Sequence, residues 1–255
     1  YICKKAQKMH DLTTLTYGKV KDTEYDLIIL PWGATEPHNY HLPYLTDSIL
    51  SHDIAVESAE LALKRYGVRC MVLPPVNLGS QNPGQRELKF CIHTRYETQK
   101  AILTDIISSL KVQNFNRMII INGHGGNSFK NMIRDLSVDF PDFMIATSEW
   151  YTVIDPSEYF CEPGDHAGEL ETSVMMYYHP ELVDMKEAGS GSYKAPKLKS
   201  LRDKTIWIPR NWQEISTDTG VGNPQFSSKE KGERFAKAIT EKYAECFAEI
   251  SRQEN

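Results

Sequence analysis

Side chains that can bind a metal ion are concentrated in the segment GATEPHNYHLPYLTD, which runs from Gly33 to Asp47 behind an apolar run. Glu36 and His38 are two residues apart, so in an extended chain they project to the same side and could share one ligand. Asp47 follows at the expected start of a helix, where its carboxylate is either a helix cap or a metal ligand. The segment is a candidate half of a metal site, with a solvated polar loop as the alternative.

A second candidate side chain, His124, lies in the segment INGHGGN. Gly123, Gly125 and Gly126 surround it, and glycine permits the close backbone approach that presents an imidazole at the end of a strand. The segment is not a phosphate-binding loop, because no Gly-Lys-Ser/Thr follows. A tight strand-to-helix turn without a chemical role is the alternative.

The third candidate segment is GDHAGELETS, which begins at Gly164. If a helix begins near Asp165, His166 and Glu169 lie three residues apart on one face, while Glu171 points away from that face. A histidine and a carboxylate in this relation suit a metal site or a proton transfer. The alternative is that the acidic residues only complement the positive end of a helix.

Apolar runs and helical patterns alternate along the chain and predict the elements that position these side chains. The runs have the length and β-branched content of strands and cover residues 26–33, 69–76, 117–123 and 143–148. Helices are expected at 46–67, 95–110 and 127–139, and at the C-terminus after a capping box at 227–230. This order predicts an α/β fold with a mostly parallel sheet covered by helices on both faces, in a single domain over residues 1–255.

The predicted topology brings two of the candidate segments together. In open parallel sheets, ligands bind beyond the carboxyl ends of the strands, where the ends of neighbouring strands meet. Glu36, His38 and His124 all follow such ends, so we expect them within reach of one another.

Composition limits the class of protein and its partners. The 255 residues carry 29 basic and 34 acidic side chains, a net charge of −5, without a basic stripe, so nucleic acid is not an expected partner. The apolar runs are far below the ~20 residues of a membrane span, and the start of the sequence lacks a signal-peptide pattern. The 5 scattered cysteines, Cys3 among them, argue against disulfides and thiolate zinc sites. We expect a soluble cytoplasmic protein without a membrane partner.

Together, the three polar segments resemble the creatininase (creatinine amidohydrolase) family, and TGVGNP followed by SSKEKGERF resembles its C-terminal passage. The resemblance extends from about residue 26 to about residue 250. It implies a three-layer α/β/α sandwich, usually a homohexamer, with two divalent metal ions in each active site. The ligands that it implies are Glu36, His38, His124 and a bridging Asp47, and it assigns proton transfer to His166.

Two features depart from the family pattern. Creatininases carry a glutamate at the position of Gly126, and Glu169 is the candidate replacement because it shares a predicted helix face with His166. Residues 76–94 lack the family's H-x-x-F-P-G-T pattern. Both departures argue against creatinine itself as the substrate.

The expected activity is metal-dependent hydrolysis of a C–N bond, of the cyclic amide or formamide type, in a small polar molecule. Oxygen and imidazole ligands without cysteine suit zinc, manganese, iron or magnesium and do not choose among them. We expect two divalent ions, with zinc first and manganese or iron as alternatives. Two metal ions would bind a hydroxide that attacks the carbonyl, and His166 would protonate the leaving nitrogen. The alternative is a metal- or ligand-binding protein of the same fold that has lost catalysis.

Several nearby residues have less specific expectations. His41 is expected to orient the loop or a ligand and not to bind metal. Asn122 and Asn127 are either partners of the metal ligands or turn residues. Trp150 and Tyr151 either close a pocket or pack in the core.

Overall fold

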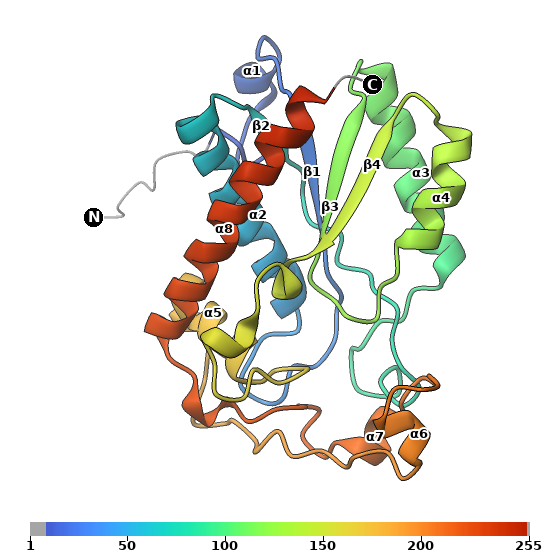
Figure 1. Cartoon of the computed structure of the whole chain (residues 1–255), viewed down its shortest axis with the longest axis vertical. Helices are drawn as coiled ribbons and strands as arrows, with labels where there is room; N and C mark the ends of the chain where they lie inside the picture. The colour runs from blue at the N-terminus through green and yellow to red at the C-terminus, as the bar shows by residue number, and fades with distance from the viewer. Residues whose placement is uncertain (1–8, 254–255) are drawn as a thin grey trace.

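The computed structural model describes residues 9–253 and is built on one parallel sheet (Figure 1). Its four strands are β1 (Leu27–Trp32), β2 (Cys70–Val72), β3 (Arg117–Asn122) and β4 (Met144–Glu149). They pair in the order β2-β1-β3-β4, and every pair is parallel. The predicted strands and their parallel arrangement are therefore confirmed.

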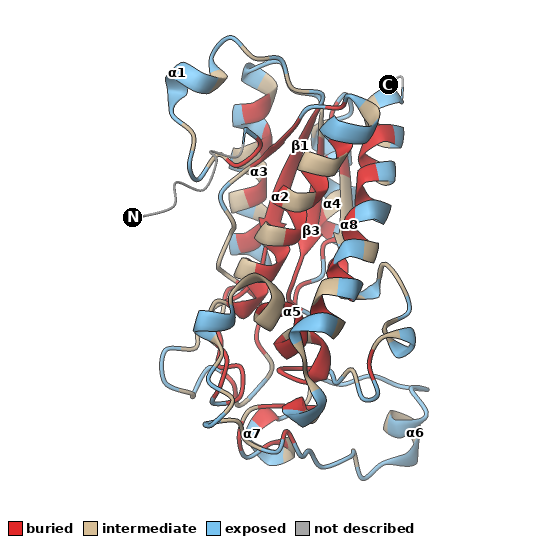
Figure 2. Ribbon diagram, turned by 90° about the vertical axis from the view of Figure 1, so that its left-hand side faces the viewer, coloured by how far each residue is buried: buried red, intermediate tan, exposed pale blue. Residues whose placement is uncertain are grey.

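Helices cover both faces of this sheet. The helices of one face are α2 (Thr46–Tyr66), α5 (Glu169–Tyr178) and α8 (Lys229–Arg252), and those of the other are α3 (Tyr96–Val112) and α4 (Lys130–Asp139). Alternate side chains of β1 point to opposite faces, so Leu27 and Ile29 join the first core while Ile28 and Leu30 join the second. Figure 2 shows the buried residues concentrated on the strands and on the helix sides that face them. The fold is the predicted three-layer α/β/α sandwich.

Helix boundaries follow local signals at some ends only. Gly67 ends α2 in the left-handed conformation (φ 72°), and its N–H bonds the carbonyls of Ala62 and Leu63, as the predicted stop requires. At the start of α8 the cap is Ser228, whose hydroxyl accepts the N–H of Lys231, one residue later than the predicted capping box. The predicted third helix starts at Lys130 instead of at residue 127.

Irregular segments connect the layers. The short helices are α1 (Tyr17–Val20), η1 (Trp150–Thr152), η2 (Pro156–Glu158), η3 (Pro180–Leu182), α6 (Lys199–Arg202), α7 (Trp212–Ile215) and η4 (Pro224–Phe226). Most of these segments gather below the carboxyl ends of the strands, where α5, α6 and α7 lie in Figure 1. This end of the sheet is where the sequence predicts the candidate site residues.

The cysteines within residues 9–253, namely Cys70, Cys91, Cys161 and Cys246, are all free, and Cys3 lies outside these residues. None of the helices in the described range is both long enough and apolar enough to span a bilayer.

Candidate metal centre

Close backbone packing brings the ends of two strands against the first turn of α2. A Cβ atom on Gly33, just after β1, would overlap the backbone of Ser48. A Cβ atom on Gly123, just after β3, would overlap the carbonyl of Asp47. Glycine at both positions therefore allows the loop of His124 and the loop after β1 to meet at Asp47.

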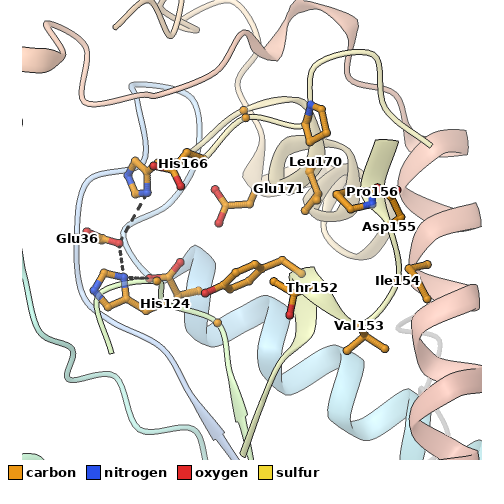
Figure 3. Close-up of a pocket in the computed structure, with 18 residues that line it drawn as sticks. Glu36, His124, Thr152, Val153, Ile154, Asp155, Pro156, His166, Leu170 and Glu171 are labelled. Carbon is orange, nitrogen blue, oxygen red and sulfur yellow. Dashed lines mark ion pairs between the residues drawn. The ribbon is translucent and has the colours of Figure 1, made fainter. Parts of the chain in front are cut away.

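Five predicted site residues converge at this point. The shortest contacts of the cluster are Glu36 Oε1 to His124 Nδ1 at 2.8 Å, His38 Nε2 to Asp47 Oδ1 at 2.9 Å, Asp47 Oδ2 to His124 Nδ1 at 3.2 Å and Glu36 Oε1 to His166 Nδ1 at 3.8 Å. All five residues are at most 7% exposed. Figure 3 shows that Glu36, His124 and His166 face one another on one side of a cavity. The predicted convergence of these side chains is observed.

Backbone carbonyls fix the orientation of the three imidazoles. The carbonyl-bonded nitrogens are His38 Nδ1 with Glu36 O at 3.0 Å, His124 Nε2 with Ser80 O at 2.8 Å and His166 Nε2 with Pro37 O at 2.8 Å. A carbonyl can only accept, so each of these nitrogens donates a proton, and the other ring nitrogen faces the carboxylates, where a metal ion would bind it. Metal-binding histidines in proteins are held in this way.

The electrostatics of the cluster favour added positive charge. Burial acts to lower the pKa of His38, but the carboxylates around it, Asp47 above all, together outweigh burial and raise the pKa to about 9. Burial opposes the charged form of His124 too, yet Glu36 and Asp47 raise its pKa well above the ordinary value. Burial disfavours the Asp47 carboxylate, and the two histidines nevertheless lower its pKa. Bound divalent cations would satisfy the same carboxylates, so the donor set fits a metal centre.

Glu169 is not part of this cluster, and its predicted role as a ligand was wrong. Helix α5 begins at Glu169 with Gly168 as its cap, instead of near Asp165, so the face assumed for His166 and Glu169 does not exist. The Glu169 carboxylate is fully buried, forms an ion pair with Lys231 and accepts the N–H of Glu162 at 2.8 Å.

Glu171, and not Glu169, is the carboxylate of α5 that lies beside the cluster. Ligand atoms of Glu171, His38 and Asp47 lie within 4.8 Å of one another, as do those of Glu36, Asp47 and His124 and those of Glu36, His38 and His166. Glu36, His38 and Asp47 each belong to two of these groups, and Asp47 is the residue that the group with His124 and the group with Glu171 have in common. Burial raises the pKa of the Glu171 carboxyl, although His38 opposes the shift. Figure 3 shows Glu171 pointing into the cavity from the side opposite Glu36.

The backbone explains why Gly126 carries no side chain. A Cβ atom on Gly126 would overlap the carbonyl of Ser80 and the Nε2 atom of His124, which are hydrogen-bonded to each other. A glutamate at this position would therefore displace His124. The carboxylate of Glu171 reaches the cluster by another route.

Two asparagines support the His124 loop. Asn122 Nδ2 donates to the His124 carbonyl at 2.8 Å, and Asn122 Oδ1 accepts the His124 N–H at 3.2 Å. Asn127 Nδ2 donates to Asn122 Oδ1 at 3.1 Å and to the carbonyl of Gly33 at 3.2 Å. The asparagines thus fix the position of a candidate ligand, which was one of the two expectations for them.

Other residues near the site resolve differently. His41 Nε2 bonds the Thr172 hydroxyl at 2.8 Å and belongs to none of the ligand groups among residues 9–253, so it ties its loop to α5. Trp150 is fully buried in the core, whereas Tyr151 lines the cavity. Burial, with Glu149 as the main charge beside it, raises the pKa of Tyr151, so its hydroxyl stays protonated and can donate.

A cavity of about 600 Å³ opens beside the cluster. Its polar side is lined by Glu36, Asp47, His124, His166 and Glu171. Its other walls come from residues 151–156 and 163–165 and from Gly168 and Leu170. Figure 3 shows Val153, Ile154 and Leu170 along these walls. A cavity of this size, apolar with a few convergent polar groups, is typical of a site for a small organic molecule or a short chain segment.

Known proteins share the sequence pattern and the fold of this chain. A family model described as creatininase, creatinine amidohydrolase, matches residues 10–247. A Bacteroides fragilis crystal structure, provisionally described as a creatinine amidohydrolase, is 60% identical with a TM-score of 0.95 and covers 97% of this chain and 98% of that one. The mycofactocin precursor peptide peptidase of Mycobacterium ulcerans is 28% identical over 95% of this chain and 91% of its own length.

Creatininase itself has the same fold. Its crystal structure has a TM-score of 0.76 at 20% sequence identity and covers 96% of this chain and 99% of that one. Similar solved structures include a Zn–Zn form of a creatininase mutant and a Mn form of creatininase. Since the family model matches nearly the whole sequence, this chain belongs to the creatininase family.

Proposed function

We propose that this protein is a metal-dependent amidohydrolase that cleaves a C–N bond with the help of two divalent metal ions. The observation that carries the proposal is the buried cluster in which two groups of potential ligands share Asp47. Glu36 and His124 would complete the first metal position, and His38 and Glu171 the second. The missing glutamate at Gly126 was the main argument for a protein that has lost catalysis. The carboxylate of Glu171 answers it, because it can replace the missing ligand.

The chain's own residues would orient the substrate and move the proton. When bound, the two ions would lower the pKa of a water molecule and polarise the substrate carbonyl. His166 donates its Nε2 proton to the Pro37 carbonyl, so Nδ1 is free to accept a proton from the attacking water and to pass it to the leaving nitrogen. Such a group contributes on the order of 10²–10⁴ in rate. The Tyr151 hydroxyl, a donor in the cavity wall, would hydrogen-bond the oxygen on which negative charge develops.

The cavity supports a substrate larger than creatinine. A space of about 600 Å³ exceeds what a single small ring needs, and Val153, Ile154 and Leu170 offer apolar contacts. The Mycobacterium ulcerans relative, which this chain matches over nearly the whole length of that protein, is named as a precursor peptide peptidase. We therefore propose a peptide-like amide as the substrate class, with small cyclic amides and formamides as the second candidates. Zinc is the proposed metal and manganese the alternative. A cytoplasmic location and a homo-oligomer, a hexamer as is usual in the family, stay predictions.

Metal analysis and turnover together test this function. Purified protein should contain about two divalent ions per chain after incubation with zinc or manganese, and Glu36→Gln and His124→Ala should each lower that content. Wild-type protein should then hydrolyse at least one member of a panel of short peptides, lactams and formamides. His166→Ala should lose turnover by about 10²-fold or more while it keeps its metal.

Two results would contradict the proposal. Less than about one ion per chain in the wild-type protein would remove the dinuclear site. Full metal content without turnover on any member of the panel would favour the metal-binding protein without catalysis.

A further inference from the structure

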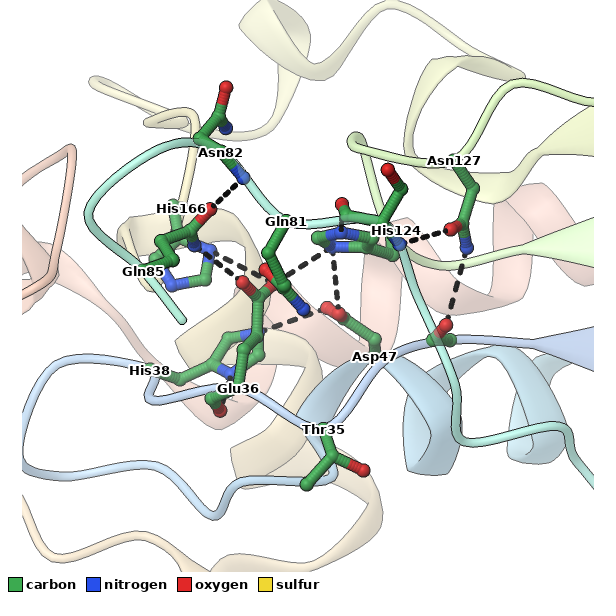
Figure 4. Close-up of polar contacts among 12 residues, drawn as sticks. Thr35, Glu36, His38, Asp47, Gln81, Asn82, Gln85, His124, Asn127 and His166 are labelled. Atoms are coloured by element: carbon green, nitrogen blue, oxygen red, sulfur yellow. Dashed lines mark hydrogen bonds and ion pairs between the residues drawn. The ribbon is translucent and has the colours of Figure 1, made fainter. Parts of the chain in front are cut away.

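Gln85 contacts the metal cluster from outside the three polar segments. Its side chain is 2% exposed, and its Nε2 atom donates to Glu36 Oε2 at 2.6 Å. Its Oε1 atom accepts the backbone N–H of Asn82 at 2.8 Å. Figure 4 shows the Gln85 carboxamide between Asn82 and Glu36. Both ends of the carboxamide are thus occupied.

These two bonds determine which end of the carboxamide faces the carboxylate. A backbone N–H can only donate, so the oxygen of Gln85 must face Asn82. The amide nitrogen must then face Glu36. Its hydrogen bond to the charged carboxylate is stronger than a hydrogen bond between two neutral groups. Gln85 therefore acts on Glu36 as a fixed donor that cannot switch to an acceptor.

The loop that carries Gln85 is itself held in place. Gly84 adopts a positive φ of 85°, and a Cβ atom there would lie 2.6 Å from Asn211 Oδ1, which favours glycine. The N–H of Trp212 donates to the carbonyl of Pro83 at 2.7 Å, and Gln213 Nε2 donates to the carbonyl of Gly84 at 2.9 Å. These hydrogen bonds from the start of α7 fix the loop and with it the position of Gln85.

We propose that Gln85 is a positioning residue that holds Glu36 as a metal ligand through one oxygen only. With Oε2 bonded to Gln85, only Oε1 faces His124 and His166. The inference rests on the proposed metal-dependent function. It assigns part of the metal affinity to the segment 76–94, which departs from the family pattern.

The choice of a neutral donor has a physical reason. A lysine or arginine at this position would bring a positive charge to Glu36 and compete with the metal ion for it. A glutamate would place two carboxylates in contact and force them to share a proton. Glutamine orients Glu36 and leaves its full negative charge for the metal ion.

A pair of matched variants tests this role. Gln85→Met keeps the approximate volume of the side chain but removes the donor. The control is Gln81→Met on the same loop, because the Gln81 side chain is 9% exposed and neither of its amide atoms has a hydrogen-bond partner among residues 9–253. Cobalt(II) titrations, followed by visible absorption and by competition with a chelator, measure the affinity and the spectrum of each bound ion.

Gln85→Met should lower the affinity for one of the two cobalt ions by about 10- to 100-fold and change the absorption bands of that ion. The other ion should bind as in wild type. Gln81→Met should bind both ions normally, and the metal-free variants should unfold at similar temperatures. Unchanged affinity and spectrum in Gln85→Met, or equal losses in both variants, would overturn the positioning role alone. Wild-type protein that binds no cobalt would overturn the proposed function and this inference with it.

Discussion

At the scale of single residues, Glu169 and Glu171 are close in sequence and differ in role. Glu171 lies in a ligand group with His38 and Asp47, whereas Glu169 pairs with Lys231. We predict that Glu171→Gln weakens the second metal ion by at least about 10-fold, because a neutral amide is a poor ligand for a divalent cation. Metal content and zinc affinity, measured with a competing chelator, check this prediction.

Glu169→Gln is the matched control for that experiment. It should keep both ions but lower the free energy of unfolding by about 1–2 kcal/mol, because Lys231 loses its charged partner. Urea unfolding of the metal-free variants measures this loss. If Glu169→Gln lost metal and Glu171→Gln did not, the assignment of the two carboxylates would be reversed.

The glycines beside His124 give a second comparison. A Cβ atom on Gly126 would overlap Ser80 and the His124 ring, whereas one on Gly125 would come no nearer than 3.6 Å to the Tyr151 hydroxyl. We predict that Gly126→Ala lowers the free energy of unfolding by about 1–3 kcal/mol and weakens metal binding through His124. Gly125→Ala should leave both properties near wild type. Thermal unfolding and metal titration of the two variants provide the measurements, and equal behaviour would refute the steric explanation.

Side-chain chemistry and position along the chain are enough to make four of the five residues candidates, and the resemblance to the creatininase family is what singles them out as ligands. Glu36, His38, Asp47 and His124 are side chains that bind metals, and each follows a predicted strand or begins a helix. Glu171 could not be found in this way, because its direction depends on where α5 begins. That boundary is set by the fold and not by the local pattern.

At the scale of elements, a long-range contact explains this boundary. His166 pairs with Val221 as an antiparallel bridge, with hydrogen bonds of 3.0 Å and 2.8 Å in the two directions. The pairing keeps His166 extended, and Ala167 takes a positive φ of 51° before the helix starts. Helical spacing alone cannot reveal such a contact, whereas the strands and the packed face of α8 were predictable because hydrophobic periodicity is a local property.

The contact between α5 and α2 should depend on pH. His179, at the end of α5, bonds Asp53 of α2 at 2.7 Å and Glu181 at 3.3 Å. The hydrogen bond to Asp53 raises the pKa of His179 above its ordinary value of 6.5. A raised pKa means that protonated His179 stabilises the folded state fully below about pH 6.5, and that this contribution is lost as the pH rises through the folded-state pKa.

We predict that His179→Gln lowers the free energy of unfolding by about 0.5–1 kcal/mol at acidic pH, a value reduced for the partial exposure of the pair. The difference from wild type should become small once the pH exceeds the raised pKa of His179, where the side chain is neutral in both states. Urea unfolding of both metal-free proteins across this range gives the comparison, since titration of the metal cluster is common to them. A difference that grows with pH would contradict the assignment.

At the scale of the whole molecule, the cluster of candidate ligands brings together separate parts of the sheet and its helices. Glu36 and His38 follow β1, Asp47 lies in the first turn of α2, His124 follows β3 and Glu171 lies in α5. Ions bound by these side chains would therefore link elements of both the central sheet and one helical layer. Metal binding should therefore stabilise the whole folded chain and not only the residues near the site.

We predict that removal of the metal with a chelator lowers the unfolding temperature by roughly 10 °C. A ligand at 1,000 times its Kd stabilises the folded state by about 4 kcal/mol, and each kcal/mol shifts the midpoint of a chain of this size by about 2–4 °C. Calorimetry of wild-type protein with and without zinc gives the shift, and Glu36→Gln should show a smaller one because one ligand of the first ion is lost. An unfolding temperature that does not respond to saturating zinc or manganese would show that these five residues do not hold a metal in the native state. The size of the response also separates one ion from two, because the second ion, held through the shared Asp47, adds its own concentration-dependent increment.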